Sequence, residues 1–247
     1  MKYLIYSLIV IMGLAACTSS KKPVNLEKAA EINAQLGSGY LAQGDLELAK
    51  LKFEKAMQQD PELAEAHSGY ALLMSRLGQI AKAEKHFKKA LSIDHYNSST
   101  LNNYGIFLCG QNKFKEADQQ FMAALKDPLY KTPEFAYTNA GRCSLKNKNQ
   151  AQAEAYFGKA LQGNPKFPDA LFEMASLQYS QRKNSQANAY LQKFERYGVH
   201  SAASLWLAVR IARALGQRDA EASYSLLLKN KFPDSEEAAF LRSATQH

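Results

Sequence analysis

Hydrophobic residues between positions 30 and 63 recur three and four residues apart on both sides of a break at Gly44-Asp45. Each side of the break therefore has one apolar face, which predicts two amphipathic helices joined by a tight turn. The small residues Gly37, Ala49 and Ala56 stand where the two helices would cross, and they predict a close approach of the helix axes. The stretch is therefore predicted to be one helical hairpin.

The same pattern returns along the chain with a period of about 34 residues and predicts six units. These units are 30–63, 64–97, 98–133, 134–167, 168–201 and 202–235. The period matches the tetratricopeptide repeat (TPR), whose single unit cannot bury its own apolar face, so that neighbouring units must stack. The predicted fold class is all-α, a TPR superhelix (α-solenoid) of about six helix-turn-helix repeats, with 236–247 as a capping C-terminal segment. Two prolines within 127–133 predict a longer loop before the fourth unit.

The N-terminus has the pattern of an export signal. A lysine precedes an apolar run at 3–14, which is shorter than the roughly 20 residues of a membrane span and typical of a secretory signal. The following Leu14-Ala15-Ala16-Cys17 resembles a bacterial lipobox, which implies a lipoprotein signal peptide at 1–16 and lipidation of Cys17. Residues 17–29 are then the lipidated cysteine and a tether. The alternative is an ordinary signal peptide cut after Ala16, with Cys17 incidental.

Two residues after the lipobox bear on the destination of the chain. By resemblance to lipoproteins of Gram-negative bacteria, Thr18 and Ser19 imply export to the outer membrane, since the aspartate that favours inner-membrane retention is absent. The expected location is the periplasmic face of that membrane, with the acyl chains on Cys17 as the anchor.

Composition and motifs narrow the class of function. The chain is 46% hydrophobic and 22% charged, which is ordinary for a folded protein, and its net charge of +8 is spread among many lysines. That charge fits either a solvated coat or an acidic partner. No histidine stands at metal-ligand spacing, and no catalytic or nucleotide-binding motif is present. We therefore expect no enzyme, no metal, no cofactor besides the lipid, no nucleic acid and no small-molecule substrate.

A TPR solenoid offers its partner a concave groove lined by first-helix side chains. In this chain the candidates are Leu41, Leu72, Arg76, Asn102, Ile106, Phe135, Arg142, Phe172 and Trp206, and Tyr179, Arg210 and Arg213 occupy equivalent positions. Apolar anchors beside basic and amide groups suit a peptide or helix with some acidic character. The alternative for each residue is packing against the neighbouring helix.

Two further cysteines, Cys109 and Cys143, fall on the first helices of adjacent units. An exported chain permits a disulfide, but the two cysteines hold non-equivalent positions in their units. A disulfide and a pair of small buried apolar residues both remain open at this point.

Three segments, at 101–117, 170–198 and 204–241, resemble the type IV pilus biogenesis and stability lipoproteins, the PilF/PilW (secretin pilotin) family. The run from Asn102 to Gly105 and the tail from Arg218 to Pro233 are the most specific parts, because the generic repeat does not require them. The resemblance implies a non-catalytic outer-membrane adaptor. Such an adaptor would bind the pilus secretin, the ring through which the fibre passes, and promote its targeting and multimerisation.

Two other functions are also compatible with the sequence. A TPR lipoprotein of the outer membrane could instead be a scaffold of β-barrel assembly, or it could regulate enzymes that act on the cell wall. Neither role requires a motif that the sequence lacks.

Overall fold

The computed structural model describes residues 25–244, and these residues form thirteen α-helices and no strand. The hairpins are α1 (Leu26–Gln43) with α2 (Leu46–Gln59), α3 (Ala64–Arg76) with α4 (Ile80–Ile93), α5 (Ser98–Gly110) with α6 (Phe114–Ala124), α7 (Pro133–Lys146) with α8 (Gln150–Gly163), α9 (Pro168–Ser180) with α10 (Asn184–Tyr197), and α11 (Ala202–Ala214) with α12 (Arg218–Lys231). The last helix, α13 (Glu236–Ala244), follows the sixth hairpin. The predicted all-α TPR superhelix is confirmed.

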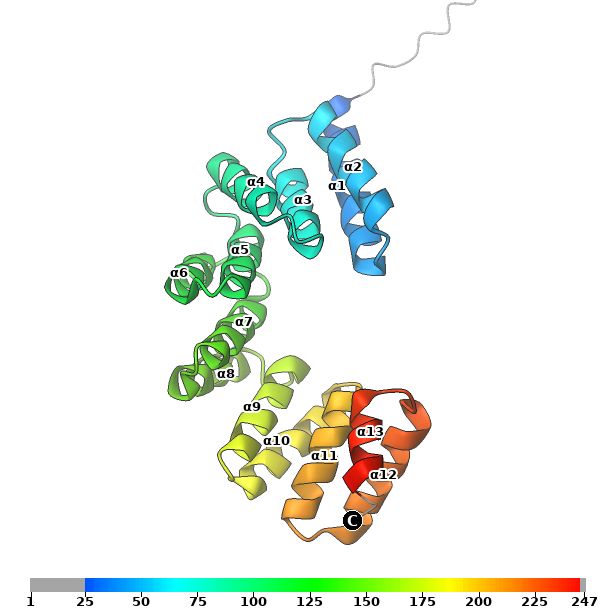
Figure 1. Ribbon diagram of the computed structural model, residues 1–247. Coiled ribbons are helices and arrows are strands. Elements are labelled where there is room, and N and C mark those ends of the chain that lie inside the picture. The colour runs from blue at the N-terminus through cyan, green and yellow to red at the C-terminus, as the bar shows by residue number, and fades with distance from the viewer. Residues whose placement is uncertain (1–24, 245–247) are drawn as a thin grey trace, which may run out of the picture.

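The hairpins stack into an open arc, with the first and last hairpins on the same side of it (Figure 1). The backbone of each first helix lies close to the first helix of the next hairpin, whereas the backbones of neighbouring second helices lie farther apart. Long side chains still join some second helices, since Tyr156 of α8 donates a hydrogen bond to Asp118 of α6 at 2.6 Å. Each second helix instead packs on the first helix that follows it. Because the backbones of the first helices approach one another more closely than those of the second helices, the stack curves toward the first helices, and they line its inner side.

A left-handed residue closes each of the six inter-helix turns. These residues are Gly44, Gly78, Asn112, Lys148, Arg182 and Gly216, with φ between 60° and 85°. They recur at the spacing of the repeats, so the turn geometry is the same even where glycine is absent. Glycine adopts this conformation without strain, whereas in lysine and arginine the Cβ atom makes it unfavourable in free energy.

Replacing Lys148 by glycine is expected to raise the free energy of unfolding by about 1 kcal/mol, because a left-handed conformation costs an L-residue roughly 1–2 kcal/mol. The Lys148 side chain is exposed and forms no hydrogen bond or ion pair with the described part of the chain. Urea denaturation measures the change. Lys148→Ala is the matched control, since it removes the same side chain but keeps the positive φ. Equal stability of the two variants would contradict the argument.

The core repeats with the helices. Phe53, Phe87, Phe121 and Phe157 occupy equivalent positions of four second helices, and all four are fully buried. A residue without a side chain faces three of these rings. A Cβ at Gly37 would lie 2.8 Å from Phe53 Cδ1, one at Gly105 would lie 2.7 Å from Phe121 Cε1, and one at Gly141 would meet Phe157. The glycines are therefore needed for space, as their place in the sequence predicts.

The repeat units begin close to the predicted positions. Helices α3, α5, α9 and α11 start at residues 64, 98, 168 and 202, and α7 starts one residue before 134. The N-terminal end differs, because α1 begins at Leu26 and takes four residues from the predicted tether at 17–29. Asn25 provides the physical reason, since its side chain accepts a hydrogen bond from Lys28 N and caps the helix.

The sixth hairpin packs differently from the others. Val209 holds the repeat position at which Gly37, Gly105 and Gly141 face a phenylalanine ring, and it joins Leu205 and Leu228 in a separate cluster. Ala238 and Leu241 of α13 complete this cluster and are themselves buried. The last helix therefore covers the apolar end of the stack, which is the role that a terminal cap has in a solenoid.

Candidate functional site

All nine predicted groove residues lie on first helices, which form the inner side of the arc (Figure 1). Ile106 and Phe135 present the largest exposed apolar surfaces among them, with 43% and 45% of each residue exposed. Leu41, Leu72, Phe172 and Trp206 are partly buried against neighbouring helices. The inner side therefore offers apolar side chains in several successive repeats.

The N-terminal end of the inner side holds a cavity of about 420 Å³ between α1 and the start of α3. Its lining is Glu31, Ala34, Gln35, Ser38, Leu63 and Glu65. These residues were not among the sequence-based candidates. Glu31, Ala34 and Ser38 occupy the same positions in their repeat as the predicted groove residues occupy in other repeats. A prediction based on repeat position therefore also selects these three residues. The two carboxylates make this end of the inner side acidic.

Asn102 does not line the inner surface as predicted. Only 7% of the residue is exposed, and its side-chain oxygen accepts a hydrogen bond of 3.1 Å from Asn139 Nδ2. Asn102 lies on α5 and Asn139 on α7, so the bond joins two neighbouring repeats. A buried amide needs such a partner, which is the physical reason for the correction.

The arginines of the inner side are mostly engaged within the protein. Arg76 Nη1 donates to the carbonyl of Leu41 at 3.0 Å, near the C-terminal end of α1. Arg142 pairs with two carboxylates of α9, at 2.7 Å to Glu173 and 3.0 Å to Asp169. Burial alone would lower the pKa of Arg142, but these two carboxylates raise it above the usual value. Both arginines thus fasten one repeat to the next.

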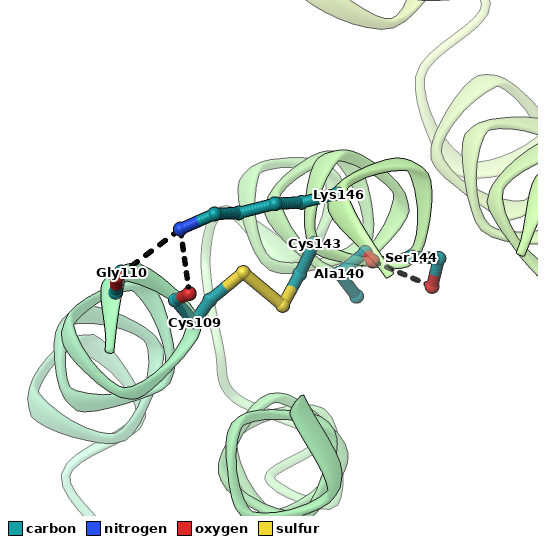
Figure 2. Close-up of a disulfide and its surroundings, with 6 residues drawn as sticks. All are labelled: Cys109, Gly110, Ala140, Cys143, Ser144 and Lys146. Atoms are coloured by element: carbon teal, nitrogen blue, oxygen red, sulfur yellow. Dashed lines mark hydrogen bonds between the residues drawn. A yellow bond between two sulfur atoms is a disulfide. The ribbon is translucent and has the colours of Figure 1, made fainter. Parts of the chain in front are cut away.

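Cys109 and Cys143 form a disulfide, which links α5 covalently to α7 (Figure 2). Of the two states that the sequence left open for these cysteines, the structure has the disulfide. Their Cα atoms lie 5.8 Å apart. Beside the disulfide, Lys146 Nζ donates to the carbonyls of Cys109 and Gly110, each at 3.1 Å, at the C-terminal end of α5. The longer loop at 125–132 separates these two repeats in the sequence, and the disulfide joins them across it.

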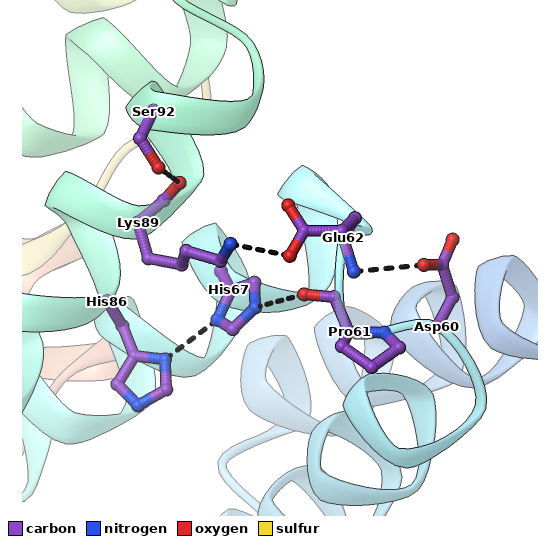
Figure 3. A network of polar contacts seen from close by, with 7 residues as sticks. All are labelled: Asp60, Pro61, Glu62, His67, His86, Lys89 and Ser92. Carbon is purple, nitrogen blue, oxygen red and sulfur yellow. Dashed lines mark hydrogen bonds and ion pairs between the residues drawn. The ribbon is translucent and has the colours of Figure 1, made fainter.

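A second polar cluster joins α3 to α4 and to the turn before α3 (Figure 3). His67 Nε2 lies 2.9 Å from the carbonyl of Pro61, and His67 Nδ1 lies 2.9 Å from His86 Nδ1. A carbonyl only accepts, so in the neutral pair His67 donates to Pro61 and accepts from His86. Burial, followed by the nearby His67, Lys85 and Lys82, lowers the pKa of His86 to about 4.

The free energy of unfolding is expected to fall as the pH decreases from 6.5 toward 4, because the unfolded chain binds a proton at His86 that the folded chain excludes. Since His86 is only half-buried, solvent screening limits the loss to about 1 kcal/mol at pH 5. Thermal unfolding of wild type and His86→Gln at pH 7 and pH 5 measures it. The variant should lose less stability than the wild type between the two pH values. An equal loss in both proteins would contradict the assignment.

The remaining candidate chemistry is limited. No group of three or more histidine, cysteine or carboxylate side chains that could hold a metal ion occurs in residues 25–244. Within the same range, every helix is too short or too polar to cross a membrane. The predicted signal peptide and Cys17 lie outside the described residues.

The repeat assignment agrees with comparison to protein families. Two models described as tetratricopeptide repeat match residues 40–95 and residues 136–167. The first covers the second half of hairpin one and all of hairpin two, and the second covers α7 with α8.

Similarity to whole proteins extends over almost the full chain. The type IV pilus assembly protein PilF of Pseudomonas aeruginosa is 37% identical over 233 residues, which are 92% of each chain. A solved structure of P. aeruginosa PilF superposes with a TM-score of 0.76 and covers 89% of this chain and 99% of that one. A crystal structure of PilW, described as a widely conserved type IV pilus biogenesis factor, has 35% identity and a TM-score of 0.75, covering 87% and 98% of the two chains.

Proposed function

The chain belongs to the PilF/PilW family of type IV pilus biogenesis TPR proteins, non-enzymatic scaffolds, and we propose that it is an outer-membrane lipoprotein that binds the pilus secretin. In this role it promotes the targeting of the secretin to the outer membrane and its multimerisation there. The observation that carries the proposal is the 37% identity to a pilus assembly protein across 92% of both chains.

The lipobox supports the membrane part of the proposal. Lipidation of Cys17 would fix the N-terminus at the membrane, and several acyl chains on one residue hold far more firmly than one. Because α1 begins at Leu26, the tether between Cys17 and the first helix is shorter than the sequence predicts. Eight residues span at most about 28 Å, so the solenoid stays near the periplasmic face.

The inner surface supports the binding part. Exposed Ile106 and Phe135, with the partly buried apolar residues of neighbouring repeats, form the kind of surface on which a peptide or helix rests its own apolar side chains. A secretin subunit bound there is held at the membrane by the anchor of its partner. Its local concentration at the outer membrane rises, and that favours multimer formation without any catalysis.

Co-purification tests the partner. The tagged protein is isolated from detergent-solubilised envelopes, and the secretin and the core subunit of the β-barrel assembly machine are both quantified. The proposal expects enrichment of the secretin, loss of it with Ile106→Asp, and retention with Leu226→Asp, which places the same charge on an exposed residue of the second helix α12. Enrichment of the barrel-assembly subunit without the secretin would contradict the proposal.

A further inference from the structure

Arg210 of α11 lies between two aromatic rings that come from different repeats. Its Cζ atom is 5.0 Å from the centroid of Tyr179 on α9 and 5.6 Å from the centroid of Trp206 on α11. Both distances are within the range of a cation–π interaction, and a planar guanidinium stacks well on such rings. The rings therefore fix the direction of the guanidinium without neutralising its charge.

Arg210 differs in this respect from the other arginines of the first helices. Arg76 donates to a backbone carbonyl, Arg142 pairs with two carboxylates, and Arg213 Nε pairs with Glu221 at 2.8 Å. Arg210 has no carboxylate or hydrogen-bond partner within the described residues, and its buried Nε is unsatisfied. The two terminal nitrogens are not among the buried atoms, so solvent or a ligand can reach them. A half-buried cation held in one orientation without a partner is suited to receive a carboxylate end-on.

Aromatic surface continues on both sides of this cation. On one side the Trp206 ring lies 6.5 Å from the ring of Phe240, which is 55% exposed on α13. On the other side is Tyr179 of α9, and the partly buried Phe172 stands about two helical turns before it on the same helix. A bound segment can therefore run past Arg210 in both directions. This arrangement favours a carboxylate on a side chain within a segment over the carboxylate at a chain end.

We propose that Arg210 anchors an aspartate or glutamate side chain of the secretin segment, and that a neighbouring apolar residue of that segment rests on Trp206 and Phe240. The proposal rests on the function proposed above and adds the chemistry of the partner. The formal charge of +8 on the chain is of the sign that attracts such an acidic segment. Phe240 was not a candidate in the sequence, because α13 lies outside the repeat pattern.

The test measures the affinity of the purified periplasmic part of the same organism's secretin for four proteins. These are the wild type, Arg210→Gln, Arg210→Lys and Arg196→Gln, each as the chain from residue 18 onward. We expect Arg210→Gln to weaken binding about tenfold and to flatten the dependence of affinity on salt. Arg210→Lys keeps the charge but not the planar fork, and we expect a smaller loss. Arg196 is exposed on the second helix α10 and has no ion-pair partner in the described range, so its variant is the matched control for loss of one charge.

The outcomes separate this inference from the proposed function. If the wild type binds and Arg210→Gln binds within twofold of it, the inference is overturned and the proposed function stands. If the wild type does not bind, the proposed function fails and the inference fails with it. Equal weakening by Arg210→Gln and Arg196→Gln would show a general charge effect and would also overturn it. Thermal unfolding of all four proteins shows whether a variant that binds more weakly is still folded.

Discussion

Replacing Phe121 by alanine is expected to lower the free energy of unfolding by about 4 kcal/mol, the middle of the roughly 3–5 kcal/mol range for buried aromatic truncations. Phe121 is fully buried on α6, in the third of the six hairpins, and its ring faces the backbone at Gly105. The helices on either side are fixed by their own hairpins, so they cannot close around the void. The stack should weaken at its centre, because each repeat depends on its neighbours.

Hydrogen exchange locates this effect. A loss of about 4 kcal/mol corresponds to exchange that is on the order of a thousandfold faster in α5 and α6. Phe240→Ala is the matched control, since the same truncation at a residue that is 55% exposed should cost under about 1 kcal/mol. Equal effects of the two substitutions, or exchange that accelerates evenly in all repeats, would contradict the packing account.

Removal of the disulfide with Cys109→Ser and Cys143→Ser is the second large effect. The two cysteines are 34 residues apart, and closing a loop of that length in the unfolded chain is worth about 4 kcal/mol in the chain-entropy model. Urea denaturation of the oxidised wild type, the reduced wild type and the double variant measures the change. Both proteins without the disulfide should lose stability, and a reductant should leave the double variant unaffected. A wild type that is equally stable with and without reductant would contradict the link.

Local pattern accounts for what the sequence could predict. An amphipathic helix is recognised from apolar residues three and four positions apart, and a repeat is recognised when that pattern returns. The starts of α3, α5, α9 and α11 therefore follow from the sequence alone. The start of α1 was also predictable, because Asn25 is a preferred N-cap residue and directly precedes a stretch with helical spacing of apolar residues. The prediction instead took its first position from the alignment of the repeats, which do not include that extra turn.

The parts that were not predictable depend on which side chains of different repeats meet. Arg142 stands at a repeat position that lines the groove, so the sequence predicts that it contacts a bound partner. In the structure it pairs instead with Asp169 and Glu173, which follow 27 and 31 residues later in the chain. Asn102 meets Asn139 across 37 residues. The crossing of adjacent first helices decides these contacts, and one sequence contains no measure of that crossing. The pairing of the cysteines was open for the same reason.

Secretin multimers in outer-membrane fractions test the central claim most directly, by immunoblot of wild type, a deletion strain and Cys17→Ala. We expect multimers to fall in the deletion strain, and to fall or to appear outside the outer membrane in the Cys17 variant, because an unanchored scaffold cannot hold its partner at that membrane. Equal abundance and location of the multimers in all three strains would contradict the account of an anchored scaffold for the secretin.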